Sequence, residues 1–204
     1  MKNENIDFPA YPSSDYLFRV PRSYHHCTLQ NFEFADPKYA AIVKHFLDNA
    51  EADRRGLFIS GFYGVGKTHL LVALYRVILA RIGGTTDCLF QTFDSMMHLL
   101  YSTGDSVFHK GVRDYISLFC DYEWLFLDDI TTQPLHLDYQ KEVLRQIING
   151  RHESKKITCI TANGSLGVLA EAGHVHPHAI SRLMEMCVEI EIKGGDRRGR
   201  RNSE

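Results

Sequence analysis

The chain has 204 residues with a formal net charge of −2, and 44% of its residues are hydrophobic. A chain of this length and composition can bury a sizeable core without disulfides or metals, and its near-neutral charge excludes a global attraction to nucleic acid or anionic lipid. Its five cysteines are scattered and odd in number, which argues against a secreted disulfide scaffold. Since no signal peptide opens the chain and no apolar run approaches the roughly 20 residues of a membrane span, we expect a soluble cytoplasmic protein.

Helix and strand patterns alternate along most of the chain. Residues 1–24 show no clear period and are expected to form an irregular N-terminal arm. In chain order, the patterns then predict a helix opened by Asp36-Pro37, a strand at 57–59, a helix at 68–82 and a strand at 88–93. They go on to predict helical stretches at 95–100 and 115–119, a strand at 124–127, a helix capped by Asp138, and strands at 157–161 and 188–192.

This alternation predicts the fold class and the domain organisation. Strands separated by helices of ten or more residues are typical of an α/β fold, in which a parallel sheet carries helices on both faces. We therefore expect one α/β domain at residues 25–193, after the arm at 1–24. Residues 194–204 are basic and glycine-rich, and we expect them to form a disordered tail.

The turn after the first predicted strand carries a phosphate-binding pattern, Gly61-x-x-x-x-Gly66-Lys67-Thr68. Its glycines permit a tight turn, and the N–H groups at the start of the next helix would point at the phosphates. Lys67 is expected to reach the β- and γ-phosphates, and Thr68 to place its hydroxyl on Mg²⁺. The residues expected to bind the nucleotide are Gly61, Tyr63, Gly64, Val65, Gly66, Lys67, Thr68 and His69.

Polar side chains end two later strands. Asp128 and Asp129 follow the apolar run at 124–127, at the strand end where open parallel sheets bind ligands. Asp128 is expected to hold Mg²⁺ through its water shell, and Asp129 either orients the attacking water or caps the following turn. Asn163 ends the strand at 157–161, where it would hydrogen-bond the γ-phosphate or the lytic water, or cap a helix or turn.

From about Tyr24 to Lys193 the chain resembles the AAA+ ATPases of the bacterial helicase-loader family, of the DnaC and IstB type. The matching segments are YHHCTLQNFEF at 24–34, GFYGVGKTHLL at 61–71, LFLDDI at 125–130, ITANGSL at 160–166 and ISRL at 180–183. In that order they resemble the family's leading segment, Walker A element, Walker B element, sensor 1 strand and arginine-finger segment.

The resemblance implies an α/β P-loop NTPase fold of the AAA+ type without a C-terminal helical lid domain, which hydrolyses ATP with Mg²⁺. It assigns sensor 1 to Asn163, and to Arg182 the arginine finger that reaches the ATP of a neighbouring subunit in a homo-oligomer. Judged from its own sequence, Arg182 is equally a surface arginine on a helix, paired with Glu185 or left in water. Arg197 and Arg198 are the candidates for a second sensor arginine, although the family's run there matches Gly194-Gly-Asp-Arg-Arg poorly.

The same family implies a replicative helicase, a transposase or single-stranded DNA as partner. Between residues 94 and 114, the side chains of Phe108, Lys110 and Arg113 suit a single strand, through base stacking and phosphate contacts, although an ordinary solvated loop explains them as well. The N-terminal region is too short for an independent helicase-binding domain, so that role is not implied. His174-x-His176-x-His178 is interpreted as a polar loop rather than a metal site.

Several functions remain open on the sequence. The leading prediction is a helicase-loader-like ATPase acting on DNA as an oligomer, with a transposition helper of the IstB type as the alternative. A nucleotide-switched module that recruits a partner with little turnover is a further possibility. A small-molecule kinase on the same scaffold is disfavoured, because we find no arginine cluster between the second and third strands and the Asp128-Asp129 pair suits water activation.

Overall fold

The computed structural model describes residues 20–83, 87–104, 106–107, 109–130 and 137–197. Within these ranges the chain forms a five-stranded sheet, in the order β2-β3-β4-β1-β5, and every pairing is parallel. The strands are β1 (Gly56–Ser60), β2 (Cys88–Thr92), β3 (Trp124–Asp128), β4 (Ile157–Ala162) and β5 (Cys187–Glu191). The α/β class and the five strands predicted from the sequence are confirmed.

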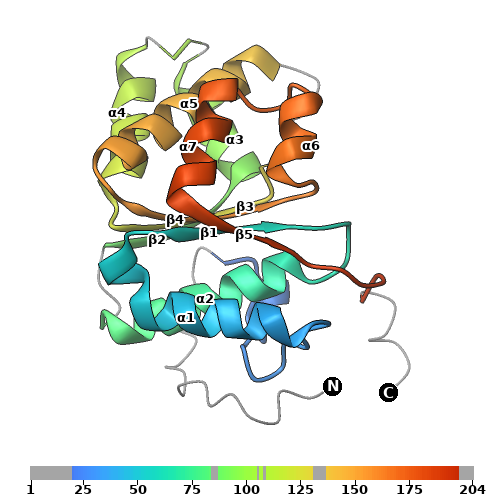
Figure 1. The fold of residues 1–204 in the computed structure, drawn as a ribbon. Coiled ribbons are helices and arrows are strands. Elements are labelled where there is room, and N and C mark those ends of the chain that lie inside the picture. The colour runs from blue at the N-terminus through green and yellow to red at the C-terminus, as the bar shows by residue number, and fades with distance from the viewer. Residues whose placement is uncertain (1–19, 84–86, 105, 108, 131–136, 198–204) are drawn as a thin grey trace.

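Helices cover both faces of the sheet (Figure 1). On one face lie α1 (Pro37–Asp53) and α2 (Lys67–Arg81); on the other lie α3 (Phe93–Thr103), α4 (Lys110–Asp121), α5 (Leu137–Glu153), α6 (Leu166–Glu171) and α7 (Pro177–Met186). A hydrophobic core lies on each face of the sheet, and alternate residues of β1 point into one or the other. Leu57 and Ile59 pack with α1 and α2, and Phe58 packs with the helices of the opposite face. With both faces covered, the inner strands β1, β3 and β4 are buried at every residue.

The local sequence explains where α1 begins and ends. The Asp36 side chain caps the helix by accepting a hydrogen bond from the backbone N–H of Lys38 at 2.9 Å, and Pro37 occupies the first turn. Arg54 ends the helix in the left-handed conformation, with φ of 52°. The buried residues recur at helical spacing and face the sheet: Ala40, Val43, Phe46, Leu47 and Ala50.

Two helical regions differ from the sequence prediction. The helix expected at 115–119 begins earlier, at Lys110, because Val112 continues the buried face of Ile116 and Phe119 one turn further back. The segment with three histidines is also not a loop throughout. His176 caps α7, its Nδ1 accepting from the backbone N–H of His178 at 3.2 Å, and Pro177 opens the helix.

A fully buried arginine joins four segments at the amino edge of the sheet, the edge where the strands begin. The guanidinium of Arg151, near the end of α5, donates to the carbonyl oxygens of Phe119, Tyr122, Glu123 and Ile157 and to Oγ1 of Thr158, at 2.7–3.4 Å. Burial lowers the pKa of Arg151 to about 10, which leaves it charged at neutral pH. Arg151 thus joins these segments as a buried cation that is surrounded by acceptors.

After β5, the last described residues of the chain run beside the P-loop. After β5 the backbone N–H of Ile192 donates to the carbonyl oxygen of Ser60 at 2.8 Å, and residues 193–197 contain neither helix nor strand. None of the helices in the described ranges is both long enough and apolar enough to cross a membrane.

Candidate nucleotide-binding site at the carboxyl edge

The glycine-rich turn between β1 and α2 adopts a conformation that requires its glycines. Gly64 has φ of 77° and Gly66 has φ of 105°, values that side-chain-bearing residues rarely adopt. Gly66 also caps α2, so the first backbone N–H groups of this long helix face the interior of the turn. The sequence thus builds a concave surface of backbone donors, to which the dipole of α2 adds positive potential.

Lys67 is buried beneath this turn, with 8% of its surface exposed. Its Nζ donates to the carbonyl oxygens of Gly61 and Phe62, at 2.9 and 2.8 Å. Two other residues of the turn behave differently. Tyr63 holds its ring in solvent, 5.8 Å from Nζ of Lys67, and Val65 buries its side chain in the core. Val65 therefore offers the site its backbone only.

Thr68 and Asp128 meet at the end of β3, as the sequence predicts for a magnesium site. The hydroxyl of Thr68 lies 3.0 and 3.1 Å from the two carboxylate oxygens of Asp128. The hydroxyl of Thr161, on β4, donates to Oδ1 of Asp128 at 2.7 Å. Burial raises the pKa of the Asp128 carboxyl above its usual value, although the hydrogen bonds from Thr161 and Thr68 oppose that shift.

Asp129 and Asn163 lie beside each other across β3 and β4. Nδ2 of Asn163 donates to Oδ1 of Asp129 at 2.9 Å. Asp129 has φ of 55°, and its backbone N–H donates to Oγ1 of Thr161 at 2.7 Å. Thr161 therefore holds both acidic residues, one by donating and one by accepting. No sequence motif marks Thr161, because its role depends on the register of β3 against β4.

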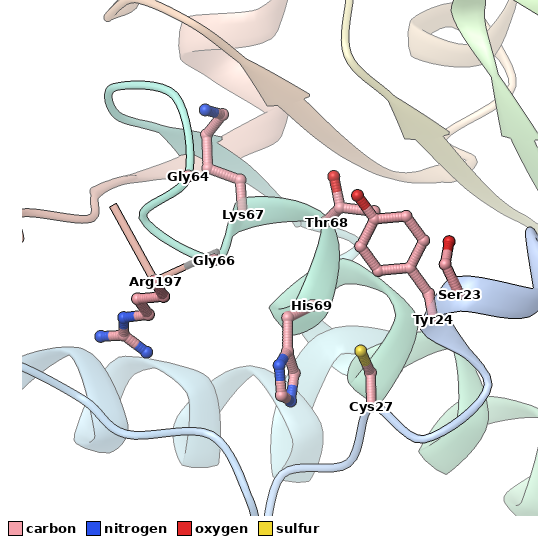
Figure 2. A pocket seen from close by; sticks show the side chains of 9 residues that line it. All are labelled: Ser23, Tyr24, Cys27, Gly64, Gly66, Lys67, Thr68, His69 and Arg197. Atoms are coloured by element: carbon pink, nitrogen blue, oxygen red, sulfur yellow. The ribbon is translucent and has the colours of Figure 1, made fainter. Parts of the chain in front are cut away.

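A cavity of about 280 Å³ extends from the P-loop toward the residues before α1 (Figure 2). Gly64, Gly66, Lys67 and Thr68 line its end at the P-loop, where the sequence predicts phosphate binding. The rest of its lining is contributed by the segment before α1, the first turn of α2 and the segment after β5: Ser23, Tyr24, Cys27, His69 and Arg197. No motif marked Ser23, and Cys27 falls in the segment at 24–34 without having been assigned to the site, because tertiary folding brings both residues to the P-loop.

Arg197 belongs to this cavity, although it lies in the predicted tail. Its backbone N–H donates to the carbonyl oxygen of Gly64 at 3.0 Å, and its guanidinium donates to the carbonyl oxygen of Glu33 at 2.8 Å. The guanidinium also lies over the ring of Phe32, 5.2 Å from its centroid. Of the two candidates for a second sensor arginine, Arg197 thus lies beside the P-loop, and Arg198 lies outside the described residues.

Arg182 lies at the opposite edge of the sheet. Arg182 lies in the last turns of α7, shortly before β5 begins at Cys187. Its side chain contacts the last turns of α5. Its Nε donates to Oδ1 of Asn149 at 2.9 Å, and its Nη1 donates to Nδ1 of His152 at 2.7 Å. Nε2 of His152 in turn lies 3.0 Å from the carboxylate of Glu185. Arg182 and Glu185 are therefore linked through a histidine.

The residues expected to contact nucleic acid lie on the helical face away from α2. Lys110 and Arg113 are exposed on the first turn of α4, and Phe108 lies outside the described residues. His176 has a structural role as the cap of α7, and the described ranges contain no group of three or more side chains that could hold a metal ion.

Comparison with known proteins identifies the family of the chain and solved structures with a similar fold. The sequence profile of the family described as "IstB-like ATP binding protein" matches residues 14–204, and no curated protein sequence matches the chain. The fold is similar to the crystal structure of the DnaC helicase loader, with a TM-score of 0.70 and 25% identity over 85% of this chain and 100% of that one. For DnaI the TM-score is 0.68, with 21% identity over 85% and 95% of the two chains. For the replication initiator DnaA bound to AMPPCP and single-stranded DNA it is 0.68, with 22% identity over 87% and 52%.

Proposed function

The chain belongs to the family of IstB-like ATP-binding proteins, it has an AAA+ P-loop fold, and we propose that it hydrolyses ATP at the carboxyl edge of its sheet. One observation carries this proposal. The hydroxyl of Thr161 contacts Asp128 at the end of β3 and Asp129 just after it, and these two also contact Thr68 and Asn163. Five polar side chains from three elements thus converge where the γ-phosphate of a nucleotide bound to the P-loop would lie.

The P-loop would hold the triphosphate through its backbone N–H groups and through Lys67. In the described structure, Nζ of Lys67 donates to two carbonyl oxygens of the turn itself. Phosphate oxygens would take the place of these acceptors, and the ammonium would then neutralise charge on the β- and γ-phosphates. Its burial favours this exchange, because a charge pair is stronger where water is excluded.

The donors at Thr68 and Asp128 fit Mg²⁺. A hydroxyl and a carboxylate are hard oxygen ligands, and they lie within 3.1 Å of each other. When bound, Mg²⁺ would neutralise charge on the phosphates. The carboxylate of Asp128 is nearly buried, and a cation beside it would relieve the cost of that burial.

Asp129 would orient the attacking water. Its carboxylate accepts a hydrogen bond from Asn163 on one side, and its backbone is fixed by Thr161 on the other, so the carboxylate has a defined direction. A carboxylate held in this way would accept a proton as water attacks the γ-phosphorus, while the amide of Asn163 would contact the γ-phosphate or the water. Asp129 and Asn163 are therefore proposed as catalytic residues, together with Lys67.

We assign to Arg182 a role in trans. It contacts α5 at the amino edge of the sheet, whereas the P-loop lies at the carboxyl edge, about 16 Å away along a five-residue strand. Arg182 would therefore meet a γ-phosphate bound by a second copy of the chain. There, it would stabilise the charge that develops on the transferred phosphoryl group.

We therefore infer that the chain is an ATPase of the helicase-loader type that acts as a homo-oligomer on DNA, and that its partner protein is a helicase or a transposase. The similarity to DnaC and to DnaA bound to single-stranded DNA supports it, as do the exposed cations Lys110 and Arg113 on α4. Repeated around an oligomer, such weak phosphate contacts would add up.

The test is ATP hydrolysis over a series of protein concentrations, with and without single-stranded DNA. Specific activity should rise with protein concentration and with DNA, and Arg182→Ala should abolish it while leaving ATP binding intact. Arg145→Ala is the matched control, because Arg145 is a half-buried arginine on α5 that pairs with Glu142 at the surface. Activity that is independent of concentration and insensitive to Arg182→Ala would refute the trans assignment, and ATP binding without turnover under any condition would indicate a switch.

A further inference from the structure

His69 follows the P-loop, yet its polar contacts are made with the segment before α1. Its Nε2 lies 3.1 Å from the carbonyl oxygen of Thr28 and 2.8 Å from Oδ1 of Asn31. Figure 2 shows the ring on the side of α2 that faces Cys27, below the phosphate-binding end of the cavity. The residue next to Thr68 thus connects the P-loop helix to a distant part of the sequence.

The hydrogen-bond network fixes the proton on His69. Nδ2 of Asn31 donates to the carbonyl oxygen of His26 at 2.8 Å, so Oδ1 faces the other way, where it accepts from the backbone N–H of Thr28 at 2.9 Å. Both groups near Nε2 of His69 are therefore acceptors. Nε2 must carry a hydrogen, which it shares between Thr28 and Asn31.

Aromatic contacts hold the ring in this position. Phe32 meets it edge to face, with centroids 5.3 Å apart and an interplanar angle of 68°, and His26 does the same at 6.1 Å and 80°. Two turns further along α2, Nη1 of Arg76 donates to the carbonyl oxygen of His25 at 2.7 Å. The same face of α2 thus holds residues 25–31 at both ends.

Ser23, Tyr24 and Cys27 line the part of the cavity away from the P-loop. Because a nucleotide whose triphosphate lies on the P-loop must place its nucleoside in the remainder of the same cavity, we call Ser23, Tyr24 and Cys27 the nucleoside wall. Its position relative to the phosphates depends on what joins residues 25–31 to α2.

We propose that His69 is a positioning residue that fixes the nucleoside wall relative to the P-loop, so that recognition of the nucleoside depends on it and recognition of the triphosphate does not. This inference rests on the proposed ATP binding. His69 acts through Thr28 and Asn31 rather than by contact with the phosphates. Loss of the N–H donor at Nε2 should loosen one side of the cavity only.

The experiment compares the binding of MgATP with that of inorganic triphosphate by calorimetry. His69→Phe keeps an aromatic ring but lacks the donor, and it should weaken ATP binding about three- to tenfold, the effect of one hydrogen bond, with triphosphate affinity unchanged. His69→Gln, which can place an N–H donor near the same position, should restore most of the ATP affinity. His98→Phe, at an exposed histidine on α3, is the matched control and should change neither affinity.

Asn31→Ala gives an independent test that does not alter the core, because Asn31 is exposed. It removes the nearer of the two acceptors of His69 and should reproduce the selective loss of ATP affinity. The inference is overturned if these variants weaken ATP and triphosphate equally, or if neither ligand is affected. If the unaltered protein binds triphosphate but not ATP, or binds neither, the proposed function itself fails.

Discussion

The two edges of the sheet treat charged groups in opposite ways. At the amino edge, the buried guanidinium of Arg151 is surrounded by five oxygen acceptors, all within the chain. At the carboxyl edge, the buried carboxylate of Asp128 receives its described hydrogen bonds from two neutral hydroxyls, and burial raises its pKa. The positive charge of Arg151 is thus satisfied by acceptors of the chain itself. The negative charge of Asp128 would be better satisfied by a bound cation.

Backbone geometry does not separate the two edges. Asp129 adopts a left-handed conformation beside the P-loop, where Gly64 and Gly66 also have positive φ, but Arg54 and Lys155 adopt it at the amino edge, just before β1 and β4. Non-glycine residues with such angles have a strained backbone, which persists only because surrounding contacts stabilise it. The two edges therefore differ in how their buried charges are satisfied, and the less fully satisfied charge lies at the edge where the nucleotide would bind.

Replacing Asp129 should have the largest effect on activity. Asp129→Asn keeps the shape of the side chain and its backbone bond to Thr161 but removes the proton acceptor. ATP hydrolysis should fall about 10²–10⁴-fold, the usual contribution of a general base, while ATP affinity changes little. Single-turnover hydrolysis and calorimetry measure the two quantities. Near-normal turnover in the Asp129→Asn variant would show that this residue only caps the turn.

At the other edge, replacing Arg151 should mainly affect stability. Arg151→Met leaves several buried acceptors without their donor, and the free energy of unfolding should fall by about 3–5 kcal/mol. Denaturant unfolding measures the change. Arg145→Met, on the exposed side of the same helix, should change stability by less than about 1 kcal/mol. Equal losses for the two variants would contradict the central role of the buried guanidinium.

A pair of threonines on β4 tests both edges with one kind of substitution. Thr161→Val removes the hydroxyl that holds Asp128 and Asp129, so hydrolysis should fall about tenfold. Thr158→Val removes the hydroxyl that accepts from Nε of Arg151, so stability should fall by about 1 kcal/mol with hydrolysis unchanged. Both variants require unfolding curves and ATPase rates. If the two substitutions had the same effects, the functional difference between the edges would be refuted.

The smallest effect concerns the charge of Asp128. Because burial raises its pKa in the folded protein, the ionised carboxylate destabilises the fold at neutral pH, and this cost disappears as the pH falls through the raised pKa toward the usual value. Nucleotide-free Asp128→Asn should therefore be more stable than the unaltered protein at pH 7.5. The difference should shrink at pH 4.5. Thermal unfolding at both pH values measures it, and a difference that grows on acidification would contradict the sign of the shift.

The sequence predicted those parts of the site that are local in the chain. Lys67 and Thr68 follow a glycine pattern, and Asp128 ends an apolar run, so spacing alone identified them. Thr161 acquires its role only from the pairing of β3 with β4, and Cys27 lines the cavity only because residues 25–31 fold back on α2. Such contacts join residues far apart in sequence, which periodicity does not reveal.

The same reasoning explains the misjudged helices. The apolar residues of α7 recur at Ala179, Ile180, Leu183 and Met186, a helical spacing that the histidines and Pro177 before it obscured. In α4, Gly111 and the charged residues of the first turn hid the contribution of Val112. The fold class survived these errors because it depends on the strands, whose apolar runs are plain in the sequence.

The order of the strands has a consequence for how the protein is made. β1, which leads into the P-loop, pairs with β4 and β5 and with no earlier strand of the described sheet: Phe58 pairs with Ile160, and Gly56 with Cys187. During synthesis, roughly a hundred residues must be added after β1 before either of its neighbouring strands has been made. Contacts between residues so distant in sequence form slowly. The nucleotide site is among the first parts of the domain to be translated and among the last to be completed, so the nascent chain exposes an apolar strand that chaperones can recognise.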